Sequence, residues 1–387
     1  MSDNTKQLRV FFVFTSASFF LSHFLSRAKD LIKNGYSVSL VGTLDCKLNE
    51  ISKHGIDFYE LKISRRSLSP LASLETCIDL FKILKKHKPD IVHNVAWKPI
   101  IFSSVVAKLV GISFIVNAPV GKGFFFTDNS ALVKFLRFSV TILLKLFLNP
   151  PNSFVVVENK GHLSELLEKH FIKAERSFLI RGAGVDINLF KATEEPELPV
   201  RLTLVSRMLW DKGVGEFVDA VRILRIKKID FRATLVGQTD DQNPASIDVK
   251  IIKKWVGEGL VEFLGQQKNI EKIWAKSHIS VLPSYHEGLP KTLIEAASCS
   301  KPIVATKIDG CMELVKDNKN GLLVPVQESL SLSYALEKLI HDKNLRLEMG
   351  ANGRQSIEME FSNEIVNQKN LDMYTRITQK LKTSRAL

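Results

Sequence analysis

Residues 201–214 read RLTLVSRMLWDKGV. The β-rich run 201–205 has the length of a buried strand, and a helical pattern begins at Val214 after a short turn. The same succession of strand, turn and helix recurs on both sides of this stretch. Such alternation is typical of βαβ units around a parallel sheet, so we expect an α/β fold.

The alternation runs through both halves of the chain. In the first half the expected strands are 8–14, 38–41, 56–61, 90–94 and 113–117. The helices between them include one stopped by Gly35, one around 71–86, and one that holds Pro99 in its first turn and ends at Gly111. In the second half the expected strands are 201–205, 233–236, 261–264, 279–282 and 303–305.

A chain of 387 residues is too long for one comfortable core and suggests two domains. The pattern breaks in a charged, proline-containing stretch at 194–199, where we place the linker. The expected domains are 1–195 and 196–365, with 366–387 as a C-terminal helix that returns toward the first domain. Both are expected to be Rossmann-like, doubly wound parallel-sheet domains, with the active site in a cleft between them.

Composition excludes several classes of protein. Hydrophobic residues make up 45% and charged residues 25%, which are ordinary globular values. The four cysteines lack paired spacing, so neither a disulfide framework nor a zinc site is expected. The first apolar run, 10–14, is too short for a signal peptide and fits a core strand better.

The net charge of +13 lies mainly in the first half. Residues 1–190 hold 25 Lys and Arg against 15 Asp and Glu, a balance of +10. No motif for reading RNA or DNA is present, so nucleic acid is not an expected partner. An anionic membrane surface and phosphorylated substrates remain as targets of the basic charge.

Three segments at strand ends of the second half carry candidate binding groups. Arg207 and Lys212 follow the first strand beside a helix start, which suits a diphosphate. Gly237 ends the next strand and would let the backbone approach a nucleoside.

The third segment, 282–296, reads LPSYHEGLPKTLIEA and holds Glu287 in a loop and Glu295 on a helix. Amides around Gly288, Leu289 and Lys291 would favour an anionic phosphate there.

These segments resemble family 4 retaining glycosyltransferases. The spacing of Glu287 and Glu295 resembles the paired-glutamate motif of that family, and Arg207 with Lys212 resembles its basic pair. Residues 181–186, RGAGVD, with Phe190, are similar to its Gly-x-Gly-Val-Asp segment. The resemblance covers nearly the whole chain and is strongest from about 177 to 325. Within the family, it is greatest to enzymes that extend undecaprenyl-diphosphate-linked sugars in protein glycosylation, O-antigen or capsule synthesis.

The resemblance implies a GT-B fold and transfer of a sugar from a UDP-sugar, an N-acetylhexosamine or a related sugar, with retention. By the same resemblance, Arg207 and Lys212 hold the donor diphosphate, Glu287 contacts the transferred sugar and Glu295 contacts the ribose. No cofactor and no metal are expected, because the chain lacks Asp-x-Asp and cationic side chains can stabilise the leaving group. Two alternatives stay open: a GT-B sugar-nucleotide 2-epimerase and a non-catalytic GT-B partner subunit.

The sequence of the first domain gives weaker indications of which residues contact the acceptor or the sugar. Many family members have a histidine after the strand equivalent to 113–117, and this chain has none there. The candidates for acceptor or sugar contacts are Ser16, His23, Lys98 and Lys122.

Residues 131–148 predict a helix with a basic stripe of Lys134, Arg137 and Lys145. Three cations make a spanning helix improbable, so we expect an interfacial helix on the anionic inner membrane. The expected location is cytoplasmic, attached peripherally to the cytoplasmic face of that membrane, with a lipid-linked saccharide as acceptor.

Overall fold

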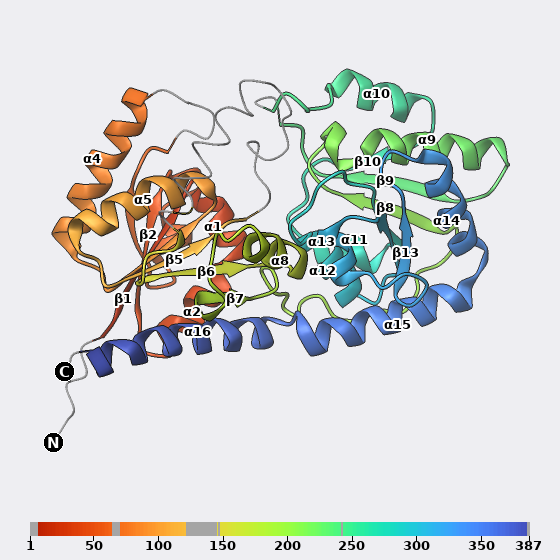
Figure 1. The fold of residues 1–387 in the computed structure, drawn as a ribbon. Coiled ribbons are helices and arrows are strands. Elements are labelled where there is room, and N and C mark those ends of the chain that lie inside the picture. The colour runs from red at the N-terminus through yellow and green to blue at the C-terminus, as the bar shows by residue number, and fades with distance from the viewer. Residues whose placement is uncertain (1–6, 64–69, 121–144, 146–147, 241–242, 385–387) are drawn as a thin grey trace. The chain divides into compact units, whose positions relative to one another are not determined.

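The computed structural model describes residues 7–63, 70–120, 145, 148–240 and 243–384. The chain forms two compact units (Figure 1). The first unit comprises 1–183 and 366–387, and the second comprises 184–365. Each unit is built around one parallel β-sheet with helices on both faces.

The sheet of the first unit has seven strands in the order β3-β2-β1-β4-β5-β6-β7, and every pairing is parallel. The order in which successive strands are added to the sheet reverses between β1 and β4, as in a doubly wound sheet. The strands are β1 (Arg9–Phe14), β2 (Ser37–Gly42), β3 (Asp57–Glu60), β4 (Ile91–Val95), β5 (Phe114–Ala118), β6 (Ser153–Val157) and β7 (Ser177–Leu179).

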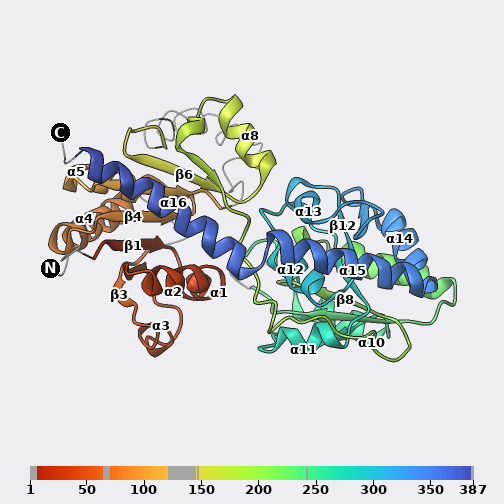
Figure 2. The same ribbon diagram turned by 90° about the horizontal axis from the view of Figure 1, so that it is seen from below.

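Alternate residues of these strands supply two separate cores. Val10, Phe12 and Phe14 of β1 face a cluster that includes α1, α2 and α16, whereas Phe11 and Val13 face α4 and α5. Figure 2 shows α16 along the same face as α1 and α2. The helices are α1 (Ala17–His23), α2 (Leu25–Lys33), α3 (Asn49–Ser52), α4 (Pro70–His87), α5 (Trp97–Val110), α8 (Lys160–Glu168) and α16 (Asn363–Ser384), with a 3₁₀ turn η1 (Ala174–Arg176).

The sheet of the second unit has six parallel strands in the order β10-β9-β8-β11-β12-β13. In chain order within the unit this is 3-2-1-4-5-6, the order of dinucleotide-binding folds. The strands are β8 (Arg201–Val205), β9 (Arg232–Val236), β10 (Glu262–Phe263), β11 (Ile279–Leu282), β12 (Ile303–Thr306) and β13 (Gly321–Val324). The expectation of two doubly wound, Rossmann-like parallel-sheet domains is confirmed.

The helices of the second unit also form two layers. Helices α9, α10 and α14 pack on one face, and α11, α12 and α13 pack on the other. Helix α15 contributes to both clusters. The helices are α9 (Val214–Ile226), α10 (Val249–Gly257), α11 (Ile270–Ala275), α12 (Lys291–Ser298), α13 (Asp309–Leu314), α14 (Ser329–His341) and α15 (Lys343–Glu360), with a 3₁₀ turn η2 (Trp210–Lys212).

The boundary between the units lies at 183/184 rather than at the expected 195/196. Residues 184–195, which we expected to belong to the first domain, bond to the second unit. The Val185 N–H donates to the Phe361 carbonyl at 3.0 Å. Arg346 holds the Glu195 carboxylate through contacts of 2.6 and 3.1 Å. These bonds make the segment part of the second fold.

Candidate functional site

The candidate donor-binding groups gather at one edge of the second sheet. Strands β8 and β11 are parallel neighbours, and the order in which strands are added to the sheet reverses between them. In such sheets ligands bind beyond the carboxyl ends of the strands at this switch point. The loops that follow β8 and β11 carry Lys212 and Glu287.

Lys212 and Glu287 form a direct ion pair. The Lys212 Nζ donates to the Glu287 Oε1 at 2.7 Å, and the two side chains are 18% and 14% exposed. Partial burial strengthens the attraction relative to a surface pair. The contact brings together two residues separated by 75 positions, both expected at the site from sequence.

Glycines allow these loops to approach closely. Gly213 has φ +70, and a Cβ there would lie 2.1 Å from the Pro283 carbonyl oxygen. A Cβ on Gly310 would lie 2.5 Å from the carbonyl oxygens of both Glu287 and Gly288. The Tyr285 N–H donates to the Asp211 carbonyl at 2.9 Å and joins the loops further. The ion pair is therefore held by tightly fitted backbone.

Glu295 lies on α12, one turn past the helix start, and its side chain is 11% exposed. Burial raises the pKa of its carboxyl, and the Lys291 ammonium, 3.4 Å from Oε1, opposes that rise. Pro290 is the N-cap rather than a first-turn residue, and its carbonyl accepts from the Leu293 N–H at 3.1 Å.

Arg207 has a partner that sequence reasoning missed. Its Nη1 donates to the Asp240 Oδ2 at 2.8 Å, from the loop after β9. The Arg207 side chain remains 49% exposed, so it is accessible to a ligand. Asp240 lies four residues beyond the end of β9. Its position after a strand end is the sequence feature that could have identified it as a candidate site residue.

For two candidate donor-binding residues, Gly237 and Leu289, packing within the second unit explains the residue type. Gly237 has φ +142, and a Cβ there would lie 1.7 Å from the Ser206 carbonyl oxygen. The close approach at Gly237 is thus to the chain that leaves β8. The Leu289 side chain is 9% exposed and packs in a core cluster with Phe190 and Leu293. Only its backbone is left to meet a ligand.

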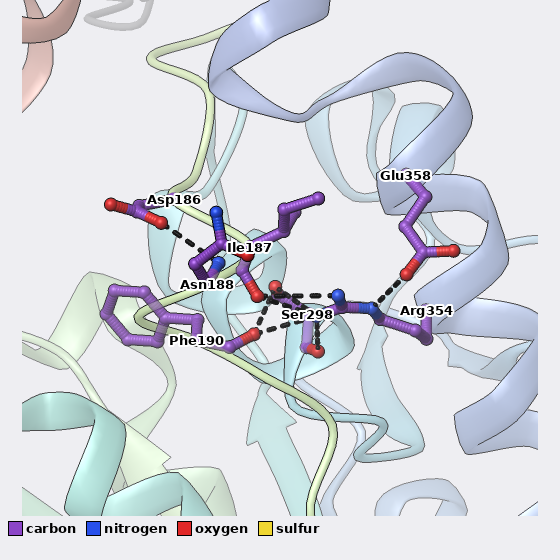
Figure 3. Close-up of polar contacts among 7 residues, drawn as sticks. All are labelled: Asp186, Ile187, Asn188, Phe190, Ser298, Arg354 and Glu358. Atoms are coloured by element: carbon purple, nitrogen blue, oxygen red, sulfur yellow. Dashed lines mark hydrogen bonds and ion pairs between the residues drawn. The ribbon is translucent and has the colours of Figure 1, made fainter.

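The Gly-x-Gly-Val-Asp segment ends in a capped turn (Figure 3). The Asp186 Oδ1 accepts from the N–H groups of Asn188 and Leu189 at 2.9 and 3.1 Å. The Phe190 N–H donates to the Asp186 carbonyl at 2.9 Å. Capping accounts for the aspartate of this motif in structural terms.

In the first unit, Ser16 caps α1 and joins two strand-end loops. Its Oγ accepts from the Phe19 N–H at 3.2 Å and donates to the Asp45 Oδ2 at 2.5 Å. The Ser18 N–H and hydroxyl also donate to the Asp45 carboxylate, both at 2.8 Å. These bonds lower the pKa of Asp45 against the opposing effect of burial. Asp45 was not identified from sequence.

The other first-domain candidates lie on helices of the same unit. The His23 ring lies at the end of α1, stacked on Phe19 with centroids 4.2 Å apart, and its Nδ1 is 2.6 Å from the Ser22 hydroxyl. Lys98 is half-buried in the first turn of α5, where desolvation lowers the pKa of its ammonium.

Lys122, Lys134 and Arg137 lie outside the described residues. Lys145 is described and exposed, and its Nζ lies 5.5 Å from the centroid of the Phe171 ring. None of the helices in the described ranges is long and apolar enough to cross a bilayer. Within the same ranges, no group of three or more His, Cys, Asp or Glu side chains is placed to hold a metal ion.

Comparisons with known proteins match both units. The family model Glycosyl transferase 4-like matches residues 9–149, and the model Glycosyl transferases group 1 matches residues 186–356.

Among curated proteins, the chain is 28% identical over 337 residues to N,N'-diacetylbacillosaminyl-diphospho-undecaprenol alpha-1,3-N-acetylgalactosaminyltransferase of Campylobacter jejuni. That match covers 84% of this chain and 86% of the relative. The chain is also 25% identical over 309 residues to UDP-Gal:alpha-D-GlcNAc-diphosphoundecaprenol alpha-1,3-galactosyltransferase of Escherichia coli, with 76% of each covered.

Solved structures share the fold over almost their full length. A glycosyltransferase from Rickettsia africae superposes with a TM-score of 0.77 at 21% identity and covers 96% of this chain and 99% of its own. Anabaena HepE, solved in complex with UDP and glucose, superposes with a TM-score of 0.76 at 18% identity. That match covers 95% of this chain and 100% of HepE.

Proposed function

The chain is a glycosyltransferase of the GT-B fold: its first region matches the glycosyl transferase 4-like model and its second region matches the group 1 model. We propose that it extends an undecaprenyl-diphosphate-linked saccharide. The resemblance to family 4 glycosyltransferases and the expected GT-B fold are both confirmed. The proposed acceptor rests on the Campylobacter and Escherichia relatives, whose names describe such lipid-linked sugars. The proposed donor is a UDP-sugar, most simply UDP-N-acetylhexosamine.

One observation carries the proposal: the ion pair of Lys212 and Glu287 at the carboxyl ends of β8 and β11. A cation at this edge can stabilise the negative charge that grows on the departing nucleoside diphosphate. The adjacent carboxylate can accept hydrogen bonds from hydroxyls of the transferred sugar. In this proposal the two residues, whose Nζ and Oε1 atoms lie 2.7 Å apart, would each serve one side of the scissile bond.

Further residues extend the donor site along the same edge. Arg207 keeps half of its side chain exposed and supplies a second cation for the diphosphate. Glu295 is buried beside Lys291 and is proposed to bind the ribose. We also propose retention of configuration and independence from metal ions, since Arg207 and Lys212 provide the positive charge that a divalent ion supplies elsewhere.

The matched proteins are transferases, and they give no support to a 2-epimerase or to a non-catalytic subunit. One experiment distinguishes a transferase from a 2-epimerase and from a non-catalytic subunit. The protein is first screened against UDP- and GDP-sugars by thermal shift. It is then incubated with the binding sugar nucleotide, with and without a polyprenyl-diphosphate-linked saccharide. We expect a new glycosidic product only with the acceptor, whereas an epimer formed without it would refute transfer.

The roles of the ion pair are tested with isosteric variants. Glu287→Gln and Lys212→Met should each lower kcat by at least ~100-fold while the protein stays folded, because each removes charge at the reacting centre. Lys227→Met is the matched control, since Lys227 pairs with Glu337 elsewhere in the same unit. Near-wild-type turnover in either site variant would remove that residue from catalysis.

We further propose peripheral attachment to an anionic membrane through Lys134, Arg137 and Lys145. Each cation near an anionic surface contributes ~1 kcal/mol, so the three together strengthen binding by roughly 150-fold. Charge reversal at all three should abolish co-sedimentation with anionic vesicles and leave binding to neutral vesicles unchanged. Reversal of three exposed lysines of α10, Lys250, Lys253 and Lys254, is the matched control. Equal loss in both triple variants would refute a specific surface.

A further inference from the structure

Arg354, on α15, is surrounded by backbone carbonyls from two distant parts of the second unit (Figure 3). Its Nη1 donates to the Ser298 carbonyl at 2.7 Å and to the Phe190 carbonyl at 2.9 Å, and it lies 3.3 Å from the Ile187 carbonyl. The Ser298 hydroxyl donates to the same Phe190 carbonyl at 2.6 Å. One guanidinium thus joins the 187–190 turn to the end of α12.

Helix α15 comes unusually close to α12 at this point. A Cβ on Gly350 would lie 2.1 Å from the Ser300 carbonyl oxygen, and one on Gly353 would lie 3.6 Å from the Ala297 Cβ. The two glycines and Arg354 lie on one face of α15, at spacings of three and four residues. The end of α12 therefore has backbone packed against it and a cation bonded to it.

The bond to Ser298 satisfies a carbonyl that α12 itself leaves without a partner. The last four carbonyls of a helix lack intrahelical donors, and the negative end of the helix dipole favours a cation. Arginine remains charged in a partly buried site, and its Nε also pairs with Glu358 at 2.6 Å. Removal of the guanidinium leaves two carbonyls without their strongest donor.

Ser298 lies three residues after Glu295 on the same short helix. The backbone of that turn is continuous with Glu295, whose carbonyl accepts from the Cys299 N–H at 3.1 Å. A shift of the helix end consequently moves the buried Glu295 carboxylate.

We propose that Arg354 is a positioning residue for the donor site: it holds the last turn of α12 so that Glu295 meets the nucleotide sugar. The inference rests on the proposed function of Glu295 as a donor ligand.

The test measures the donor Kd by calorimetry with the UDP-sugar that binds the wild type. Arg354→Met should raise the Kd by about ten-fold. Arg354→Lys should retain part of the affinity, because one ammonium group replaces only some of the N–H donors of the guanidinium. Glu358→Gln, which removes only the exposed ion-pair partner, should stay within about two-fold of wild type.

A double-mutant cycle with Glu295→Gln separates positioning from general destabilisation. If Arg354 acts through Glu295, Arg354→Met should change the Kd by less than about two-fold in the Glu295→Gln background. A full ten-fold effect in that background, or an unchanged Kd in the single variant, overturns the proposal.

Hydrogen–deuterium exchange gives a readout that does not need a donor. Arg354→Met should accelerate exchange of the amides at 298–301 and leave those of α9 unchanged. If the wild type binds no sugar nucleotide, the proposed function fails, while exchange still reports whether Arg354 holds this turn. Unchanged exchange at 298–301 would overturn the positioning role.

Discussion

A single methyl group at Gly213 should force apart the loops that hold the ion pair. In Gly213→Ala the new Cβ would lie 2.1 Å from the Pro283 carbonyl oxygen, and Cβ atoms do not approach closer than 3.0 Å. The two loops must therefore separate by about 0.9 Å. A rigid displacement of the loops by that amount would lengthen the contact between Lys212 and Glu287 from 2.7 Å to about 3.6 Å, beyond hydrogen-bond range.

Alanine substitutions at two other glycines show how much of the stability loss in Gly213→Ala comes from backbone strain and how much from the steric clash. Gly259 has the same φ of +70 with nothing within 4 Å of its Cβ position, so Gly259→Ala should cost only the backbone strain, ~1–2 kcal/mol. Gly257 has neither a positive φ nor a neighbour within 4 Å, and Gly257→Ala should stabilise α10 by ~0.5–1 kcal/mol. Gly213→Ala adds ~1–3 kcal/mol of overpacking to the strain.

Urea unfolding followed by tryptophan fluorescence measures these differences in the second unit, which holds Trp210, Trp255 and Trp274. Transfer assays on the folded variants measure catalysis. A misplacement of ~1 Å can cost ~100-fold in rate, so we expect that loss in kcat for Gly213→Ala and near-normal rates for the two controls. Equal stability of Gly213→Ala and Gly259→Ala would refute the clash. A destabilised Gly213→Ala with normal kcat would refute the link between loop spacing and catalysis.

Two further predictions concern acidity and metal ions. Burial lowers the pKa of His93 to about 3, so the unfolded chain binds the proton first and stability is lost as pH falls from about 6.5 towards 3. The free energy of unfolding should fall by up to ~1.4 kcal/mol per pH unit. In His93→Gln the urea unfolding midpoint should therefore depend less on pH between 4.5 and 6.5. The same dependence of the midpoint on pH in both proteins would contradict this. EDTA should leave the transfer rate unchanged, and a loss restored by magnesium or manganese would show that Arg207 and Lys212 are not sufficient.

Local residue patterns were enough to predict most of the architecture. Strand 201–205, the helix from Val214 and the loop that holds Glu287 were all readable, because strand length, turn residues and helix starts depend on neighbours in sequence. The likeness of 282–296 to a known motif identified the candidate carboxylates. A parallel sheet then implies that groups at successive strand ends share one edge.

Long-range packing decided what these residues contact. The pairing of Lys212 with Glu287, the bond from Arg207 to Asp240 and the carbonyl cluster around Arg354 join residues from 33 to 167 positions apart. No local pattern encodes such contacts, since they depend on which loops and helices the strand order makes neighbours. The assignment of residues 184–195 to the second unit had the same origin. In sequence they lead into the charged, proline-containing stretch at 194–199 where the linker was expected, and only the Arg346 donors on α15 and the backbone near Phe361 show that they are bound to the second unit.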